Sequence, residues 1–253
     1  MLEPFEFIFW EALKLFALVV MALVAGKAAK SFAGTGRRPG LRSFALYGAI
    51  LLLVAIGSRA LGQDVAAEAY GWAGAKNLDR HQYLLAYSNA TRAVELRPGF
   101  LRYWQLLARA KFSARQYRSV LGDEAVFRTL SPQGLDEDDL IRLAYCRYFT
   151  GEYQQVIPLT DELIRRNPAY PKTYLLAGLA KAGLRQYPEA ERDLLQALKL
   201  LPTQADAVEA LAQTYFLGGD TGAAVAVLNA TGHYSFSPDE RRHFEALKAL
   251  YEQ

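Results

Sequence analysis

The 253-residue sequence predicts an all-α fold in which two transmembrane helices precede an α-solenoid of about five helix hairpins and a C-terminal capping helix. Three observations lead to this prediction. Two stretches near the N-terminus are apolar and almost free of charge, proline recurs every 34 to 36 residues further along, and no segment is typical of β-strands. The predicted domains are a membrane anchor over residues 1–63 and a repeat domain over residues 64–253.

The second apolar stretch is the clearer membrane span. Residues 43–58 carry no charged side chain, and residues 41–61 make 21 positions, which correspond to roughly 31 Å of helix at about 1.5 Å per residue. This length matches the ~30 Å hydrocarbon core of a bilayer. Arg42 and Arg59 lie near enough to its ends to extend their charges toward the head groups.

The first apolar stretch, residues 5–26, contains two charges, Glu11 and Lys14. They lie three residues apart, so they share a helix face and can pair. One interpretation places them at the membrane interface beside Trp10, with the span starting late or tilted. A second makes them an intramembrane pair that contacts a partner subunit. A third is an interfacial helix that never crosses the membrane.

The charges around the two spans predict their orientation. The connecting loop carries five bases and no acid, namely Lys27, Lys30, Arg37, Arg38 and Arg42. Basic loops favour the cytoplasmic side, so both termini are expected on the other side. A cleaved signal peptide fits poorly, because acids rather than bases precede the first apolar run. We therefore expect a multi-pass protein of a bacterial inner membrane whose repeat domain is periplasmic.

Charge and composition exclude several function classes. The net charge of +3 comes from the anchor, since residues 64–253 hold 22 basic and 23 acidic groups. A nucleic-acid binder would need excess positive charge on its folded domain. The single cysteine, Cys146, and three scattered histidines suggest no metal, cofactor or catalytic constellation. The acidic run 136–139 fits the start of a helix. We therefore predict a non-enzyme without a cofactor, a metal or a small-molecule substrate.

A repeat of about 34 residues organises the rest of the chain. Residues 171–204 are its clearest copy, with small and bulky side chains at helical spacing at Tyr174, Ala177, Gly178, Tyr187, Ala190, Leu194 and Ala197 and a closing Pro202. Closing prolines also occur at Pro98, Pro132 and Pro168. Small residues such as Gly178 and Ala190 allow two helices to approach closely.

This pattern resembles the tetratricopeptide repeat (TPR) family over residues 67–236. The units are 67–100, 101–134, 137–170, 171–204 and 205–238, with the first the weakest and the last departing from the pattern at its closing proline. Ser237-Pro238-Asp239-Glu240 then carries the signals of a helix start, and that helix would cap the last repeat.

The resemblance implies a concave groove lined by the first helix of each pair, and therefore a protein partner. Carried over position by position, the groove residues are Arg102, Gln105, Arg109, Phe112, Ile141, Tyr145, Tyr148, Phe149, Lys172, Leu175, Leu179, Asp206, Gln213 and Phe216. Several of these aromatics could instead pack between helices. The Lys and Asn with which some members of the family hold a terminal carboxylate are not present at the corresponding positions.

Two functions fit these predictions. The first is a membrane-anchored adaptor or scaffold that binds a protein partner, itself membrane-associated, in the groove during assembly of a cell-envelope complex. The alternative is a structural accessory subunit of an exopolysaccharide, respiratory or photosynthetic membrane complex, held through its spans and Glu11 and Lys14.

Overall fold

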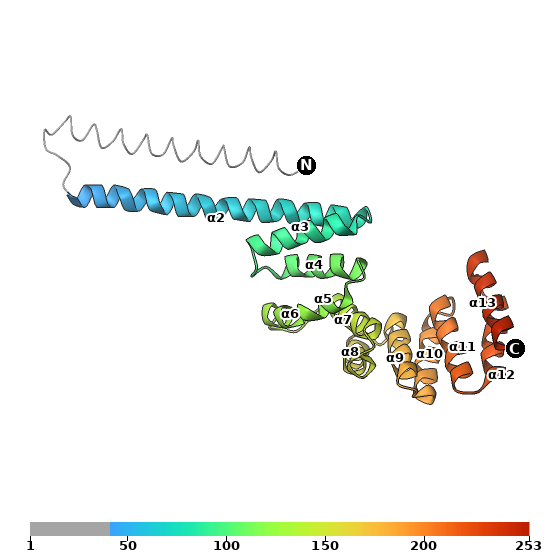
Figure 1. Ribbon diagram of the computed structural model, residues 1–253. Helices are drawn as coiled ribbons and strands as arrows, with labels where there is room; N and C mark the ends of the chain where they lie inside the picture. The colour runs from blue at the N-terminus through green and yellow to red at the C-terminus, as the bar shows by residue number, and fades with distance from the viewer. Residues whose placement is uncertain (1–40, 253) are drawn as a thin grey trace. The chain divides into compact units, whose positions relative to one another are not determined.

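The computed structural model describes residues 41–252, in which every regular element is a helix (Figure 1). The all-α prediction is confirmed for this part of the chain. The elements are α2 (Leu41–Asp79), α3 (Tyr83–Leu96), α4 (Leu101–Ser113), α5 (Tyr117–Gly122), α6 (Glu124–Leu130), α7 (Glu137–Phe149), α8 (Tyr153–Arg166), α9 (Pro171–Gly183), α10 (Tyr187–Leu200), α11 (Ala205–Leu217), α12 (Thr221–Ala230), a 3₁₀ turn (Thr231–His233) and α13 (Pro238–Tyr251).

The chain divides into two compact units at residues 114 and 115. Helices α2, α3 and α4 belong to the first unit, and α5 to α13 belong to the second. The division falls in the turn inside the second predicted repeat, and α2 runs without a break across the predicted domain boundary at residue 63. The helix of the predicted second span therefore continues directly into the first repeat.

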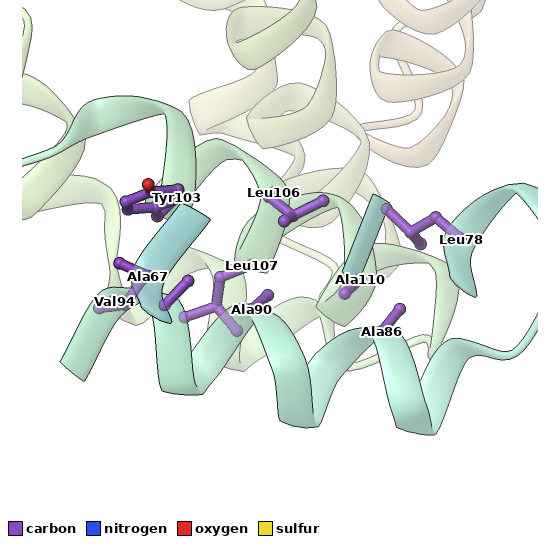
Figure 2. Close-up of a cluster of buried hydrophobic side chains, with 10 residues drawn as sticks. Ala67, Leu78, Ala86, Ala90, Val94, Tyr103, Leu106, Leu107 and Ala110 are labelled. Atoms are coloured by element: carbon purple, nitrogen blue, oxygen red, sulfur yellow. The ribbon is translucent and has the colours of Figure 1, made fainter. Parts of the chain in front are cut away.

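In the first unit, α3 packs against α2, and α4 packs against both. Small side chains of α3 make this possible: Ala86, Ala90 and Ala93 are fully buried. The three alanines belong to one cluster with α2 and α4 side chains. The members labelled in Figure 2 are Ala67, Leu78, Ala86, Ala90, Val94, Tyr103, Leu106, Leu107 and Ala110. At Gly74, an added Cβ would lie 3.1 Å from Leu106 Cδ2, so α2 and α4 approach closely here.

The membrane prediction falls largely outside what is described. Counting only the described residues, no helix is both long enough and apolar enough to cross a membrane. The predicted span 41–61 lies on the N-terminal part of α2, where most side chains are not described. The span 5–26, together with Glu11 and Lys14, lies outside the described residues. Both spans stay predictions.

In the second unit, α7 to α13 pack one after another. The first helices of repeats 3, 4 and 5 begin at residues 137, 171 and 205, where the predicted units begin. The turn between paired helices is also the same in all five repeats. In every repeat, the fifteenth residue of the unit lies in this turn and has a positive φ. The values are 57° at His81, 59° at Arg115, 82° at Gly151, 60° at Arg185 and 91° at Gly219. The hairpin register predicted from the sequence is therefore present.

Both helix starts predicted from acidic residues are present. The Asp136 carboxylate accepts a hydrogen bond from the Asp139 backbone N–H at 2.8 Å, which caps α7. At α13, Ser237 and Glu240 form a reciprocal capping box. Helix α13 then buries Phe244 and Tyr251 against α11 and α12, so the last repeat is covered.

The second helix of repeat 2 differs from the prediction, because it is broken into α5 and α6 at Asp123. Gly122, which is a weak helix former, directly precedes the break. Glu124 at the start of α6 is paired with Arg147 of α7, and Arg147 also bonds Glu152 at 2.9 Å. The Glu124–Arg147 pair therefore links the broken helix to repeat 3.

Candidate protein-binding surface

The predicted groove residues lie in both units, and those of the first unit lie on α4. Arg102 is paired with Glu68 of α2, and its guanidinium lies 5.0 Å from the centre of the Tyr103 ring. Arg109 is exposed, whereas Gln105 and Phe112 are half-buried. This face of α4 is therefore polar and partly occupied by internal contacts.

In the second unit, α7 carries the most distinctive predicted residues. Phe149 stacks on Tyr117 of α5 with ring centres 4.6 Å apart, and Tyr148 contacts both Phe149 at 5.5 Å and Tyr153 of α8 at 5.6 Å. Tyr145 stacks on Phe149 at 6.1 Å. We call these five residues, Tyr117, Tyr145, Tyr148, Phe149 and Tyr153, the aromatic cluster.

The rings of the cluster are unequally exposed. The Phe149 side chain is 50% exposed, whereas the side chains of the four tyrosines are more deeply buried. Burial raises the pKa of Tyr145 to about 12, with a further contribution from the negative charge of Asp206, and burial also raises the pKa of Tyr148. The two hydroxyls therefore stay neutral at physiological pH. The tyrosines therefore pack between helices, as the second interpretation expected, while Phe149 is exposed and its role as a groove residue stays a prediction.

Leu175 is wrong as a groove residue. Its side chain is 3% exposed and packs with Leu194 and Ala197 of α10 and Leu211 of α11. The reason is the close packing of α9, where an added Cβ at Gly178 would lie 2.6 Å from Leu194 Cγ. With the helices this close, a leucine at this position reaches the core.

The remaining predicted positions are more accessible. Ile141 and Leu179 are half-buried, with Leu179 resting on the core of repeats 4 and 5, and Lys172, Asp206 and Gln213 are exposed. Phe216 is 39% exposed, and one face of its ring stacks on Tyr251 of α13 at 4.4 Å. The capping helix thus takes up part of the aromatic surface at the C-terminal end.

Sequence reasoning missed a pocket beside the aromatic cluster. It has a volume of about 490 Å³, and its lining includes Arg115, Tyr117, Arg118, Phe149 and Thr150. Tyr117 and the tyrosine of α8 occupy the seventeenth position of their repeats. Four repeats carry a tyrosine there, at Tyr83, Tyr117, Tyr153 and Tyr187. This recurring tyrosine was the feature of the sequence that could have indicated ring contacts at the start of the second helices.

Two features bear on metal and thiol chemistry in the described part of the chain. No group of three or more His, Cys, Asp or Glu side chains among them could hold a metal ion. Cys146 is fully buried, and burial raises the pKa of its thiol to about 12. The thiolate required of a nucleophile is therefore scarce at neutral pH.

The sequence matches no protein-family model and none of the curated proteins compared with it. Solved structures do resemble the fold. MamA, residues 41 to the end, from Desulfovibrio magneticus RS-1 is 16% identical with a TM-score of 0.61, covering 66% of this chain and 94% of that one. TTC0263, a thermophilic TPR protein of Thermus thermophilus, is 22% identical with a TM-score of 0.53, covering 72% of this chain and 98% of that one.

A third similar structure is YrrB, described as a TPR protein with an unusual peptide-binding site. It is 14% identical with a TM-score of 0.54, covering 68% of this chain and 88% of that one. Together these likenesses define a TPR-like helical repeat fold.

Proposed function

We propose that this chain is a scaffold whose second unit binds a partner polypeptide on the surface around the aromatic cluster. The observation that carries the proposal is the half-exposed Phe149 ring, fixed by stacking on Tyr117 and contacts with Tyr145 and Tyr148. Exposed, rigid aromatics are enriched at protein interfaces, because they bury a large area at little entropic cost.

The size of the effect can be estimated from area. An aromatic side chain buries roughly 150–250 Å², so covering the exposed half of Phe149 would remove about 100 Å² from water. At about 25 cal/mol per Å², this corresponds to about 2.5 kcal/mol of binding free energy. That is the size of an interface hot spot, and the packed tyrosines around it would exclude water.

Membrane attachment is a further part of the proposal. The spans 5–26 and 41–61 would anchor the chain in a bacterial inner membrane, with the repeats on the periplasmic side and the basic loop in the cytoplasm. The unbroken α2 supports this arrangement, because residues 41–61 and the first repeat then share one helix. Anchoring would raise the effective concentration of membrane-associated partners, as assembly of an envelope complex requires.

Capture of partners by the full chain tests the scaffold. We expect Phe149→Ala to weaken capture by about tenfold or more, with Tyr148→Ala acting in the same direction. Leu195→Ala, which truncates an exposed apolar side chain on α10, is the matched control and should leave capture unchanged. Undiminished capture by a folded Phe149→Ala variant would refute the proposal. Retention of the partner by residues 1–63 alone would favour the accessory-subunit function.

Orientation has its own experiment. In a Cys146→Ala background, Gln253→Cys should react with a membrane-impermeant thiol reagent on cells with a permeabilised outer membrane. Labelling only after lysis of the inner membrane would reverse the proposed topology. A wild-type control should stay unlabelled, since Cys146 is fully buried.

A further inference from the structure

We infer that the pocket beside the aromatic cluster binds an acidic segment of the partner that carries an aromatic side chain. This rests on the proposed scaffold function and names the chemistry of its partner. The pocket lies where α5 begins and α7 ends, and all of its lining residues belong to the second unit.

One side of the pocket is aromatic. The Tyr117 and Phe149 rings are nearly parallel, with an interplanar angle of 19°. Tyr117 is half-buried, but Phe149 keeps half of its surface open, so the stack presents one ring to an incoming side chain. An aromatic side chain of a partner can pack against the exposed part of the Phe149 ring.

The charged side of the pocket is positive. Arg115 and Arg118 are both exposed, and neither forms an ion pair with any residue that the structure describes. The carboxylate next to Thr150 is that of Glu152, which accepts a hydrogen bond from the Thr150 hydroxyl at 3.2 Å and is paired with Arg147. Two guanidinium groups are thus available for carboxylates, with which they form bidentate hydrogen bonds.

The corresponding place in repeat 4 shows what makes this pocket different. It also has an arginine in the turn, Arg185, whose φ of 60° matches the 59° of Arg115. However, the ring of this pocket comes from the thirteenth position of the repeat that follows the turn arginine, and the equivalent residue after Arg185 is Leu217 of repeat 5. Arg185 therefore has an exposed leucine where Arg115 has an exposed phenylalanine, which makes Arg185 a matched control.

Charge argues for an acidic polypeptide rather than a nucleic acid. Residues 64–253 hold nearly equal numbers of acids and bases, and the pocket contributes only two arginines. Nucleic-acid binding depends on many phosphate contacts spread over a basic surface. A short acidic segment needs only the local pair of guanidinium groups.

Fluorescence polarisation with synthetic peptides tests the inference. The full chain in a non-ionic detergent is titrated into a labelled Glu-Glu-Phe-Glu-Glu peptide, a version with Ala for Phe, and a version with Lys for Glu. We expect the first peptide to bind about tenfold more tightly than the Ala version. It should also bind at least about tenfold more tightly than the Lys version, and addition of salt should weaken binding.

Variants then separate the two sides of the pocket. Arg115→Gln combined with Arg118→Gln should weaken binding of the acidic peptide by about tenfold, and Phe149→Ala should remove the preference for Phe over Ala. Arg185→Gln should bind like the wild type. Arg115 and Arg185 are the positive-φ residues of their turns, whereas Arg118 and Phe149 lie on helices. Circular dichroism should verify that each variant is folded.

Several results would overturn the inference. They are equal binding of the acidic and basic peptides, wild-type affinity in the double arginine variant, or tighter binding of a labelled oligothymidine that depends on the same arginines. Suppose that partner capture is lost in Phe149→Ala but kept in the double arginine variant. This result would refute the acidic nature of the bound segment and leave the scaffold function standing. Capture that is insensitive to Phe149→Ala would refute the scaffold surface itself.

Discussion

Repeats 3 and 4 have the same architecture, but the first helix ends in aromatic residues in repeat 3 and in small residues in repeat 4. Their first helices, α7 and α9, are both 13 residues long, and their second helices, α8 and α10, are both 14. Both turns hold a residue with positive φ. Yet α7 ends in Tyr148 and Phe149, where α9 ends in Ala182 and Gly183. The twelfth and thirteenth positions therefore differ in size and chemistry between the two repeats, while the helix lengths and the turn conformation stay the same.

Unlike the helix-end positions, two core positions are buried in both repeats. The eighth and twenty-fourth residues are buried in both, as Ala144 and Thr160 in repeat 3 and as Gly178 and Leu194 in repeat 4. The smaller residue at one position accompanies the larger one at the other, as close packing requires. The repeat thus constrains the combined volume of these positions rather than the identity of either.

The largest expected effect concerns the tenth position, which is fully buried in both repeats as Cys146 and Ala180. Burial raises the pKa of Cys146 from 9.0 to about 12, so at pH 8 the thiolate should be about a thousandfold scarcer than in the unfolded chain. Thiol labelling of the folded protein should slow by at least that factor. The stability linked to this thiol is present below pH 9 and is lost as the pH rises toward 12.

The same measurement tests whether the repeats are equivalent. Ala180→Cys in a Cys146→Ala background should be protected from labelling to a similar extent. Rapid labelling at position 180 but not at 146 would show that α9 opens more readily than α7, which would break the comparison.

The next largest effect is expected for Leu194→Ala. Leu194 is fully buried in the core of repeats 4 and 5, so its truncation should reduce the free energy of unfolding by about 3 kcal/mol. Thr160→Ala at the equivalent position should cost about 1 kcal/mol, because it removes fewer buried atoms and a hydroxyl that bonds the Ile157 carbonyl at 2.9 Å. Hydrogen exchange of α8 and α10 in the full chain measures both, and equal losses would contradict the volume argument.

A smaller effect is expected for Gly178→Ala. Its new Cβ would lie 2.6 Å from Leu194 Cγ and 3.2 Å from the Ala190 carbonyl oxygen, so we expect a net loss of about 1–2 kcal/mol despite the better helix propensity of alanine. In a Leu194→Ala background, the same substitution should be neutral or stabilising. A double-mutant cycle measured by hydrogen exchange should therefore give a clear coupling free energy between the two positions, and additivity would contradict the contact.

Much of the repeat register could be predicted, because a helix hairpin needs small side chains at fixed contact points and a particular turn. Gly178, Ala190 and Gly151 carried that information in the sequence. The break at Asp123 was not predicted from Gly122 alone, and the neighbouring contact between Glu124 and Arg147 of another helix is present only in the folded chain.

The site was predicted less completely than the fold. Tyr148 and Phe149 were named from the sequence because they occupy groove positions on a first helix, and their binding role stays a prediction. Leu175 occupies such a position too, but the close approach of α10 draws it into the core. Arg115 and Arg118 were missed because a turn residue and a second-helix residue lie outside that positional scheme, and only the folded hairpin brings them beside Phe149.

The smallest expected effect concerns the turn that all five repeats share. Arg185 adopts a φ of 60°, a left-handed conformation that costs a non-glycine residue roughly 1 kcal/mol and glycine almost nothing. Because glycine also has greater freedom in the unfolded chain, Arg185→Gly should stabilise repeat 4 by only about 0.5 kcal/mol. The converse change in repeat 3, Gly151→Ala, should destabilise it by about 1 kcal/mol, since the φ of 82° would then strain an alanine. Opposite shifts in hydrogen exchange around the two turns would show that the backbone requirement is common to both repeats. Shifts of the same sign would mean that side-chain contacts of Arg185, rather than its backbone, determine the stability of the turn.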